Sequence, residues 1–220
     1  MGLLPRMTVT LSTPPNPLRI GDTAPNFTAR STRGPLSLAD FRGRWLVLFA
    51  HPADFTPVCT SEFVALARAA GQFEALGCAL IGISVDSLYS HLAWLRLIRD
   101  RFGIEVNFPL VEDPTLEIAR AYGMIGSDAI DASAVRATYI LDPDGILRAM
   151  TCYPVEIGRS IDEILRMLAA LQRVSRDEVL TPADWQPGSD VLLAPTTALD
   201  SVLGGAAASD WFYATLADKG

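Results

Sequence analysis

Apolar residues occur along the chain in blocks whose spacing predicts alternating strands and helices. The uninterrupted apolar run at residues 45–50 predicts a strand covered on both faces, and residues 78–84 predict a second strand. Between residues 87 and 102 the apolar positions recur at helical spacing, and Gly103 stands where a helix C-cap is expected. The first half of the chain is therefore predicted as strand, helix, strand, helix.

The second half continues this alternation and adds a hairpin. Residues 115–122 predict a short helix, and residues 160–174 predict an amphipathic one. The turn sequence Asp142-Pro-Asp-Gly145 separates two predicted strands, at residues 137–141 and 146–152. Strands that alternate with helices indicate the α/β class, here with a hairpin at one edge of the sheet.

Composition divides the chain into three segments. Residues 1–17 are rich in Pro, Thr and Ser and predict a flexible N-terminal tail. Residues 18–175 carry the predicted strands and helices and form one domain. Residues 176–220 are rich in Pro, Gly, Ala and Ser and predict an extended arm, with apolar islands at residues 191–194 and 211–213. Because such islands need burial, we expect the arm to lie against the domain or a second subunit.

Overall composition limits the functions to consider. The chain of 220 residues has a net charge of −7 and no basic stripe, so no nucleic-acid partner is expected. No apolar run reaches the length of a membrane span, roughly 18 residues, and the N-terminus lacks the features of a signal peptide. The three cysteines form no secreted disulfide framework, which fits a reducing compartment. We therefore expect a cytoplasmic protein.

The candidate chemistry lies between the first predicted strand and the helix that follows it. The stretch reads His51-Pro-Ala-Asp-Phe-Thr-Pro-Val-Cys59, and the helix should run to about residue 77. Thr56 is a good N-cap and Pro57 suits the first helical position, which places Cys59 in the first helical turn. Unpaired backbone N–H groups and the helix dipole favour a thiolate over a thiol there.

The effect on a thiol at such a position can be large. An ordinary cysteine has a pKa near 8.5 and is only about 3% thiolate at neutral pH. A helix N-terminus with a cationic neighbour can lower that pKa to roughly 3.5–7.5, which makes the sulfur a nucleophile. The alternative is an inert buried cysteine, which is common in cores. With no Cys-x-x-Cys pair and two histidines in all, neither a metal nor a cofactor is expected.

The motif Pro52-x-x-x-Thr56-x-x-Cys59 resembles the active-site signature of the peroxiredoxins, thiol peroxidases with a thioredoxin-like fold. The longer string from His51 to Glu62 is similar to the one-cysteine, peroxiredoxin-6-like subgroup. The resemblance runs from about Leu18 to the C-terminus and includes these further blocks in order: residues 91–94, 136–139, 158–166 and 181–185. It implies a central mixed sheet with helices on both faces and an extended C-terminal arm.

The resemblance assigns catalytic roles to four residues. Cys59 is the nucleophile that a peroxide oxidises to a sulfenic acid. Thr56 holds the peroxide through its hydroxyl, Arg136 contacts both sulfur and peroxide, and Pro52 shields the sulfur from water. The residues alone leave alternatives open: Thr56 as a helix cap, Arg136 as a surface charge at a strand end, and Pro52 as a loop proline.

Three further residues are assigned a supporting role by the same resemblance. Glu62 lies three residues after Cys59 on the same helix face, where it bonds the active-site arginine, and Arg159 is a second arginine of that network. His51 could reach the site. The alternatives are a solvated glutamate for Glu62 and a structural role for His51, which we do not assign as a general base.

The remaining cysteines bear on how a sulfenic acid would be resolved. Cys78 opens an apolar strand and is predicted to be a core residue, whereas Cys152 near a strand end keeps a smaller chance of pairing with Cys59. The arm after residue 181 has no cysteine, so we expect resolution by an external thiol or thiol protein. The expected function is reduction of hydrogen peroxide and organic hydroperoxides by a homodimer or a ring of dimers. The alternative is a redox-gated chaperone or binding protein.

Overall fold

The computed structural model describes residues 18–125, 136–203 and 211–218. By their internal contacts these residues form two compact units, one up to Ile161 and one from Asp162 onward, and each is described by itself. These contacts group the helix that begins near residue 161 with the arm, whereas the sequence analysis placed the boundary after that helix, between residues 175 and 176. The predicted domain division stays a prediction. The predicted N-terminal tail, residues 1–17, lies outside the described residues.

A mixed seven-stranded sheet forms the centre of the first unit. Its order is β2-β1-β5-β4-β3-β6-β7; β3, β4 and β5 run parallel and the other neighbours are antiparallel. The strands are β1 (Thr28–Ser31), β2 (Gly34–Ser37), β3 (Trp45–Ala50), β4 (Cys78–Ser84), β5 (Leu110–Glu112), β6 (Arg136–Leu141) and β7 (Leu147–Tyr153). The predicted hairpin, β6 and β7, occupies one edge. The outer strand of the second hairpin, β2, was not predicted, because Gly34 and Pro35 give no strand signal.

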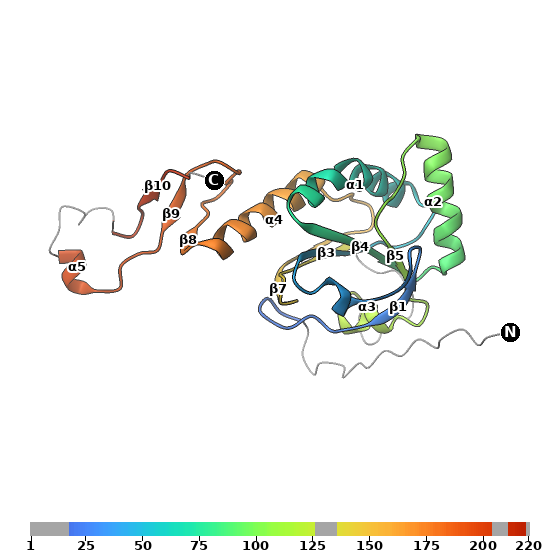
Figure 1. Ribbon diagram of the computed structural model, residues 1–220, viewed down its shortest axis with the longest axis horizontal. Helices are drawn as coiled ribbons and strands as arrows, with labels where there is room; N and C mark the ends of the chain where they lie inside the picture. Colours follow the sequence, from blue (N-terminus) through green and yellow to red (C-terminus); the bar gives the residue numbers. More distant parts are fainter. Residues whose placement is uncertain (1–17, 126–135, 204–210, 219–220) are drawn as a thin grey trace. The chain divides into compact units, whose positions relative to one another are not determined.

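Helices cover both faces of this sheet. They are the short 3₁₀ helix η1 (Leu38–Phe41), α1 (Pro57–Ala75), α2 (Leu88–Phe102) and α3 (Glu117–Ala121). Figure 1 shows α1 on one face of the sheet and α3 on the other. The predicted α/β class with a central mixed sheet is therefore confirmed. In the part of the chain that the structure describes, no helix combines the length and apolarity that crossing a membrane requires.

Local signals explain where the helices begin and end. The Ser87 hydroxyl accepts the Ser90 N–H and starts α2, and Gly103 ends it in the left-handed conformation (φ 66°), as predicted. In contrast, α3 begins at Glu117, two residues later than expected. Leu116 is itself left-handed (φ 59°), so the helix cannot extend back through it.

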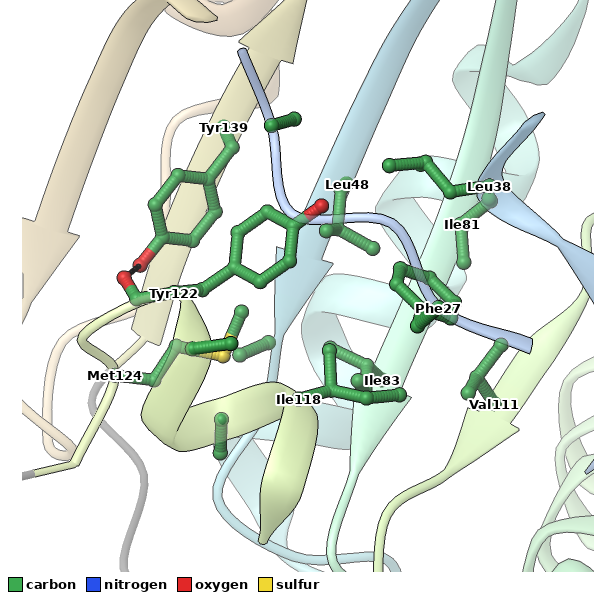
Figure 2. Close-up of a cluster of buried hydrophobic side chains, with 14 of the residues drawn as sticks. Phe27, Leu38, Leu48, Ile81, Ile83, Val111, Ile118, Tyr122, Met124 and Tyr139 are labelled. Atoms are coloured by element: carbon green, nitrogen blue, oxygen red, sulfur yellow. Dashed lines mark hydrogen bonds between the residues drawn. The ribbon is translucent and has the colours of Figure 1, made fainter. Parts of the chain in front are cut away.

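A large hydrophobic cluster lies between the sheet and α3 (Figure 2). Leu48, Ile81 and Ile83 contribute from β3 and β4, and Ile118 contributes from α3. The hydroxyl of Tyr139 is buried there, and burial raises its pKa, but it donates a hydrogen bond to the backbone oxygen of residue 122 at 2.7 Å. The polar group is thus satisfied within an apolar core.

The second unit contains a helix and a small antiparallel sheet. Its elements are α4 (Ile161–Arg176), β8 (Val179–Leu180), β9 (Val191–Leu193), α5 (Leu199–Leu203) and β10 (Thr215–Leu216), with strand order β10-β9-β8. Two alanines of α4 form a buried cluster with Val179, Trp185 and Val191. One predicted apolar island is thus partly buried. The other, at residues 211–213, is exposed.

Packing around Gly82 gives a stability prediction. A Cβ built on this β4 residue would lie 2.9 Å from Leu110 Cδ1 and 3.1 Å from Phe49 Cζ. Gly82→Ala should therefore lower the free energy of unfolding by roughly 1–3 kcal/mol, measured by urea denaturation. Gly71→Ala is the control: it lies within α1 with nothing within 4 Å of its Cβ, so it should stabilise by about 0.5–1 kcal/mol. Equal effects of the two substitutions would contradict this packing.

Candidate active site

The turn from β3 into α1 buries Cys59 at the start of a helix. Pro57 is the first residue of α1, so Cys59 lies in the first turn, as predicted, and it is fully buried. Thr56 occupies the N-cap position with extended backbone angles (φ −91°, ψ 150°). The sulfur therefore lies at the positive end of a 19-residue helix.

Arg136 contacts this sulfur directly. Its Nη1 lies 3.2 Å from Cys59 Sγ, although 77 residues separate them in sequence. Arg136 opens β6, which pairs with β3, and its side chain is only 2% exposed. Its Nε and Nη2 both donate to the backbone oxygen of Val155, at 3.0 and 2.6 Å, which fixes the plane of the guanidinium. Arg136 is thus a buried residue of the site.

Glu62 links Arg136 to Arg159. One carboxylate oxygen accepts from Arg136 Nη1 at 2.9 Å and from Arg159 Nη2 at 2.8 Å. The other accepts from the backbone N–H and Nε of Arg159, at 2.8 and 2.9 Å. Burial alone would raise the pKa of Glu62, but hydrogen bonds to Arg159 and the charges of both arginines lower it. The predicted network of three residues is therefore present, and its formal charge is +1.

Thr56 does not use its hydroxyl as a helix cap. The N-cap position is as predicted, but Oγ1 donates to the backbone oxygen of Ala53 at 2.9 Å and accepts no N–H from α1. A hydroxyl that donates one hydrogen bond still has lone pairs free to accept another. Pro52 lies half-buried in the same turn, between β3 and α1.

His51 belongs to a buried cluster that the sequence analysis missed. Its Nε2 lies 2.9 Å from one oxygen of Asp54, and Nδ1 of His91, on α2, lies 2.8 Å from the other. Burial lowers the pKa of His51, with Asp54 acting in the opposite direction. Burial would raise the pKa of Asp54, but the two histidines outweigh it and lower the pKa to about 2. The sequence did offer a signal for this cluster, because Asp54 follows His51 by three positions within a predicted turn.

The sequence comparisons bear directly on this site. The model of the AhpC/TSA family matches residues 20–150, and the model of the C-terminal domain of 1-Cys peroxiredoxin matches residues 170–204. Peroxiredoxin 2 of Thermoplasma acidophilum is 46% identical over 184 residues, which cover 84% of this chain and 92% of that one. The chain belongs to the peroxiredoxin family. The peroxiredoxin of Aquifex aeolicus is 50% identical over 170 residues, 77% of each chain.

Solved structures agree with this peroxiredoxin assignment. A yeast mitochondrial 1-Cys peroxiredoxin, whose structure is described as showing thiol resolution through glutathione/thioredoxin systems, has a TM-score of 0.78 and is 37% identical, covering 84% of this chain and 91% of that chain. A mutant peroxiredoxin 6 of Arenicola marina has a TM-score of 0.76 and 35% identity, covering 84% and 87%. The thioredoxin-like fold is confirmed. As a peroxiredoxin, the chain is a thiol peroxidase that reduces a peroxide at the expense of a thiol.

The other two cysteines of this peroxiredoxin differ in environment. Cys78 is buried at the start of β4, as predicted, and burial raises the pKa of its thiol to about 12. Cys152 is exposed on the edge strand β7, opposite Ala137 of β6. All three cysteines are free thiols in the structure.

Among the described residues, one group has metal-ligand character. Atoms of His51, Asp54 and Asp86 lie within 4.8 Å of one another. Both oxygens of Asp54 already accept from histidines, and an oxygen of Asp86 accepts the Asp54 N–H at 2.8 Å and the Ser84 hydroxyl at 3.0 Å. Internal hydrogen bonds therefore already engage these carboxylate oxygens.

Removing the charge of Glu62 should strongly destabilise the peroxiredoxin. Glu62→Gln leaves two buried guanidinium groups without their shared anion, so the free energy of unfolding should fall by roughly 3–5 kcal/mol in urea denaturation. Asp100→Asn is the control, because Asp100 pairs with arginines in solvent and should have little effect. Wild-type stability for Glu62→Gln would show that the network contributes nothing.

Asp54 should make the stability depend on acid pH. Its folded pKa of about 2 lies below the ordinary 3.8, so the folded state holds the proton less tightly than the unfolded chain. The resulting stabilisation, about 2 kcal/mol, is complete above roughly pH 4 and is lost as the pH falls towards 2. The stability difference between wild type and Asp54→Asn, measured by urea denaturation at each pH, should shrink over that interval. A difference that stays constant would refute the assignment.

Proposed function

We propose that the peroxidase cycle of this protein uses Cys59 as its one redox-active cysteine. The thiolate attacks one oxygen of the peroxide, the O–O bond breaks, and the second oxygen leaves with the bonding electrons and takes up a proton. The products are Cys59 sulfenic acid and water, or an alcohol when the substrate is an organic hydroperoxide. The observation that carries this proposal is the 3.2 Å contact between Arg136 Nη1 and the buried sulfur.

The charges around the sulfur support its thiolate form. Arg136, Arg159 and Glu62 together leave one positive charge that is buried and uncompensated by the carboxylate. A thiolate at Cys59 would make the group neutral, and an uncompensated buried charge is costly. The first turn of α1 adds the positive end of the helix dipole.

The same donors can stabilise the oxygen that leaves. Of the five N–H bonds of Arg136, two point to Val155, one to Cys59 and one to Glu62, so among the described residues one on Nη2 is left for the peroxide. We assign the Thr56 hydroxyl as a second group that orients the peroxide, and Pro52 as the residue that limits water near the sulfur. Donors fixed before the reaction stabilise developing negative charge most effectively.

We infer that an external thiol or thiol protein resolves the sulfenic acid. Cys78 is buried with a pKa of about 12, and Cys152 lies exposed on an edge strand. The yeast neighbour described above is a 1-Cys enzyme resolved through glutathione/thioredoxin systems, which supports the same route here. The comparisons give no support to the alternative of a redox-gated chaperone.

We also propose a homodimer or a ring of dimers. Within the described residues no strand pairs with β7 on its outer side, where only Leu147 at its start bonds to the backbone of Gly21 and Asp22. Exposed apolar side chains lie on β7 and shortly after it: Met150, Val155 and Ile157. Light scattering across a range of concentrations tests this assembly, and a monomer throughout would contradict it.

Substitution of each cysteine tests the one-cysteine cycle. Cys59→Ser should abolish peroxide consumption with dithiothreitol as reductant, because no other thiol contacts Arg136. The matched controls Cys78→Ser and Cys152→Ser should keep consumption near wild type. After one equivalent of hydrogen peroxide, peptide mapping should find Cys59 as a sulfenic acid trapped by dimedone. A Cys59–Cys152 disulfide would contradict external resolution, and an active Cys59→Ser variant would contradict the whole proposal.

A further inference from the structure

The turn that leads into α1 contains a residue in an unfavourable conformation. Phe55 is left-handed (φ 58°), although it has a side chain and that side chain is exposed. This region of backbone angles is sterically disfavoured for a residue other than glycine. A strained backbone persists only where its surroundings determine it. Phe55 lies between Asp54 and Thr56, so its angles decide how the turn enters the helix that carries Cys59.

On one side of Phe55, Asp54 is tied to three different elements. Its carboxylate accepts from His51, which follows β3, and from His91 on α2. Its backbone N–H donates to Asp86, which follows β4. Asp54 is ionised at neutral pH and can only accept, so each imidazole donates to it. The second nitrogens of the two rings, His51 Nδ1 and His91 Nε2, are buried without a partner among the described residues.

On the other side of Phe55, the start of α1 is hydrogen-bonded to α2, the helix that carries His91. The hydroxyl of Thr60 donates to the backbone oxygen of Thr56 at 2.7 Å and accepts from Trp94 Nε1 at 3.2 Å. Trp94 follows His91 by three residues, so both project from one face of α2. The Phe55 turn is thus held at both ends against α2.

We propose that Asp54 is a positioning residue for the peroxide reaction, because by joining His51 to His91 it holds the left-handed turn at Phe55 and so sets where Thr56 stands relative to Cys59. Both carboxylate oxygens of Asp54 bind imidazoles and not the sulfur, so its effect passes through the backbone of the turn. The inference rests on the proposed function, in which Thr56 orients the peroxide. It assigns to a pair of buried histidines a role that requires no proton transfer.

The test compares two reactions of the same sulfur. Reduction of hydrogen peroxide needs the aligned donors, whereas alkylation by iodoacetamide needs only an accessible thiolate. Asp54→Asn cannot accept from both imidazoles in the same way, so its rate constant with peroxide should fall about 10- to 100-fold. Its alkylation rate should stay the same or rise. Parallel loss of both reactions, or an unchanged peroxide rate, would overturn the proposal.

Three further variants complete the experiment. His91→Phe removes one of the two donors, and it should lower the peroxide rate in the same direction if Asp54→Asn does not fold. Asp142→Asn is the matched control: Asp142 is also buried and accepts two backbone N–H groups, but it lies in the β6–β7 turn and should leave the ratio of the two rates unchanged. Phe55→Gly should restore part of the peroxide rate to Asp54→Asn, because glycine adopts this conformation without cost.

The outcomes separate this proposal from the proposed function. If Cys59→Ser still consumes peroxide, the one-cysteine cycle is wrong whatever Asp54 does. If Cys59 is essential but Phe55→Gly restores nothing, the cycle stands and the positioning role of Asp54 fails.

Discussion

The candidate active site depends on one carboxylate shared between two buried arginines. Glu62 accepts hydrogen bonds from Arg136 and Arg159, and Arg136 in turn contacts Cys59. Without this carboxylate, two cations would lie together in the interior, which is strongly destabilising. Glu62 therefore stabilises both guanidinium groups, and one excess positive charge remains next to the sulfur. Each arginine is also fixed by backbone oxygens, of Val155 for Arg136 and of Ala137 for Arg159.

A second buried carboxylate, that of Asp54, joins the residues around the turn between β3 and α1. Asp54 joins residues from three elements through its two oxygens and its N–H, next to a backbone conformation that few side chains adopt. The two carboxylates differ in their partners. Glu62 pairs with groups that are always charged, while Asp54 pairs with imidazoles. Permanently charged cations thus lie next to the sulfur, whereas Asp54 binds imidazoles in the turn that leads to it.

Sequence reasoning predicts those parts of the site that rest on local signals. Thr56 and Pro57 mark the start of α1, and this places Cys59 in its first turn without further information. The contact with Arg136 spans 77 residues, and no spacing rule reaches that far. It became predictable only through the resemblance to peroxiredoxins. The general fold was predictable for the same reason as α1, since its strands and helices carry clear hydrophobic patterns.

What escaped prediction depends on tertiary contacts or on unusual backbone. Asp54 contacts His91, 37 residues later in the chain, only because α2 packs beside the turn. The left-handed angle at Phe55 has no sequence signal, since glycine or asparagine would be expected there. The strand β2 was hidden by a glycine and a proline, and the strands of the arm are too short to show a pattern.

The arrangement around Glu62 also has a consequence for biosynthesis. Glu62, on the helix that carries the sulfur, bonds to Arg136, which lies 74 positions later in the sequence. It also bonds to Arg159, which lies 97 positions later, just before α4. A ribosome must therefore release nearly three quarters of the polypeptide before the cationic partners can reach Cys59. Long-range contacts of this kind form late, after the cost of closing large loops has been met. Until then Cys59 lacks its contact with Arg136, which arises only in the completed fold.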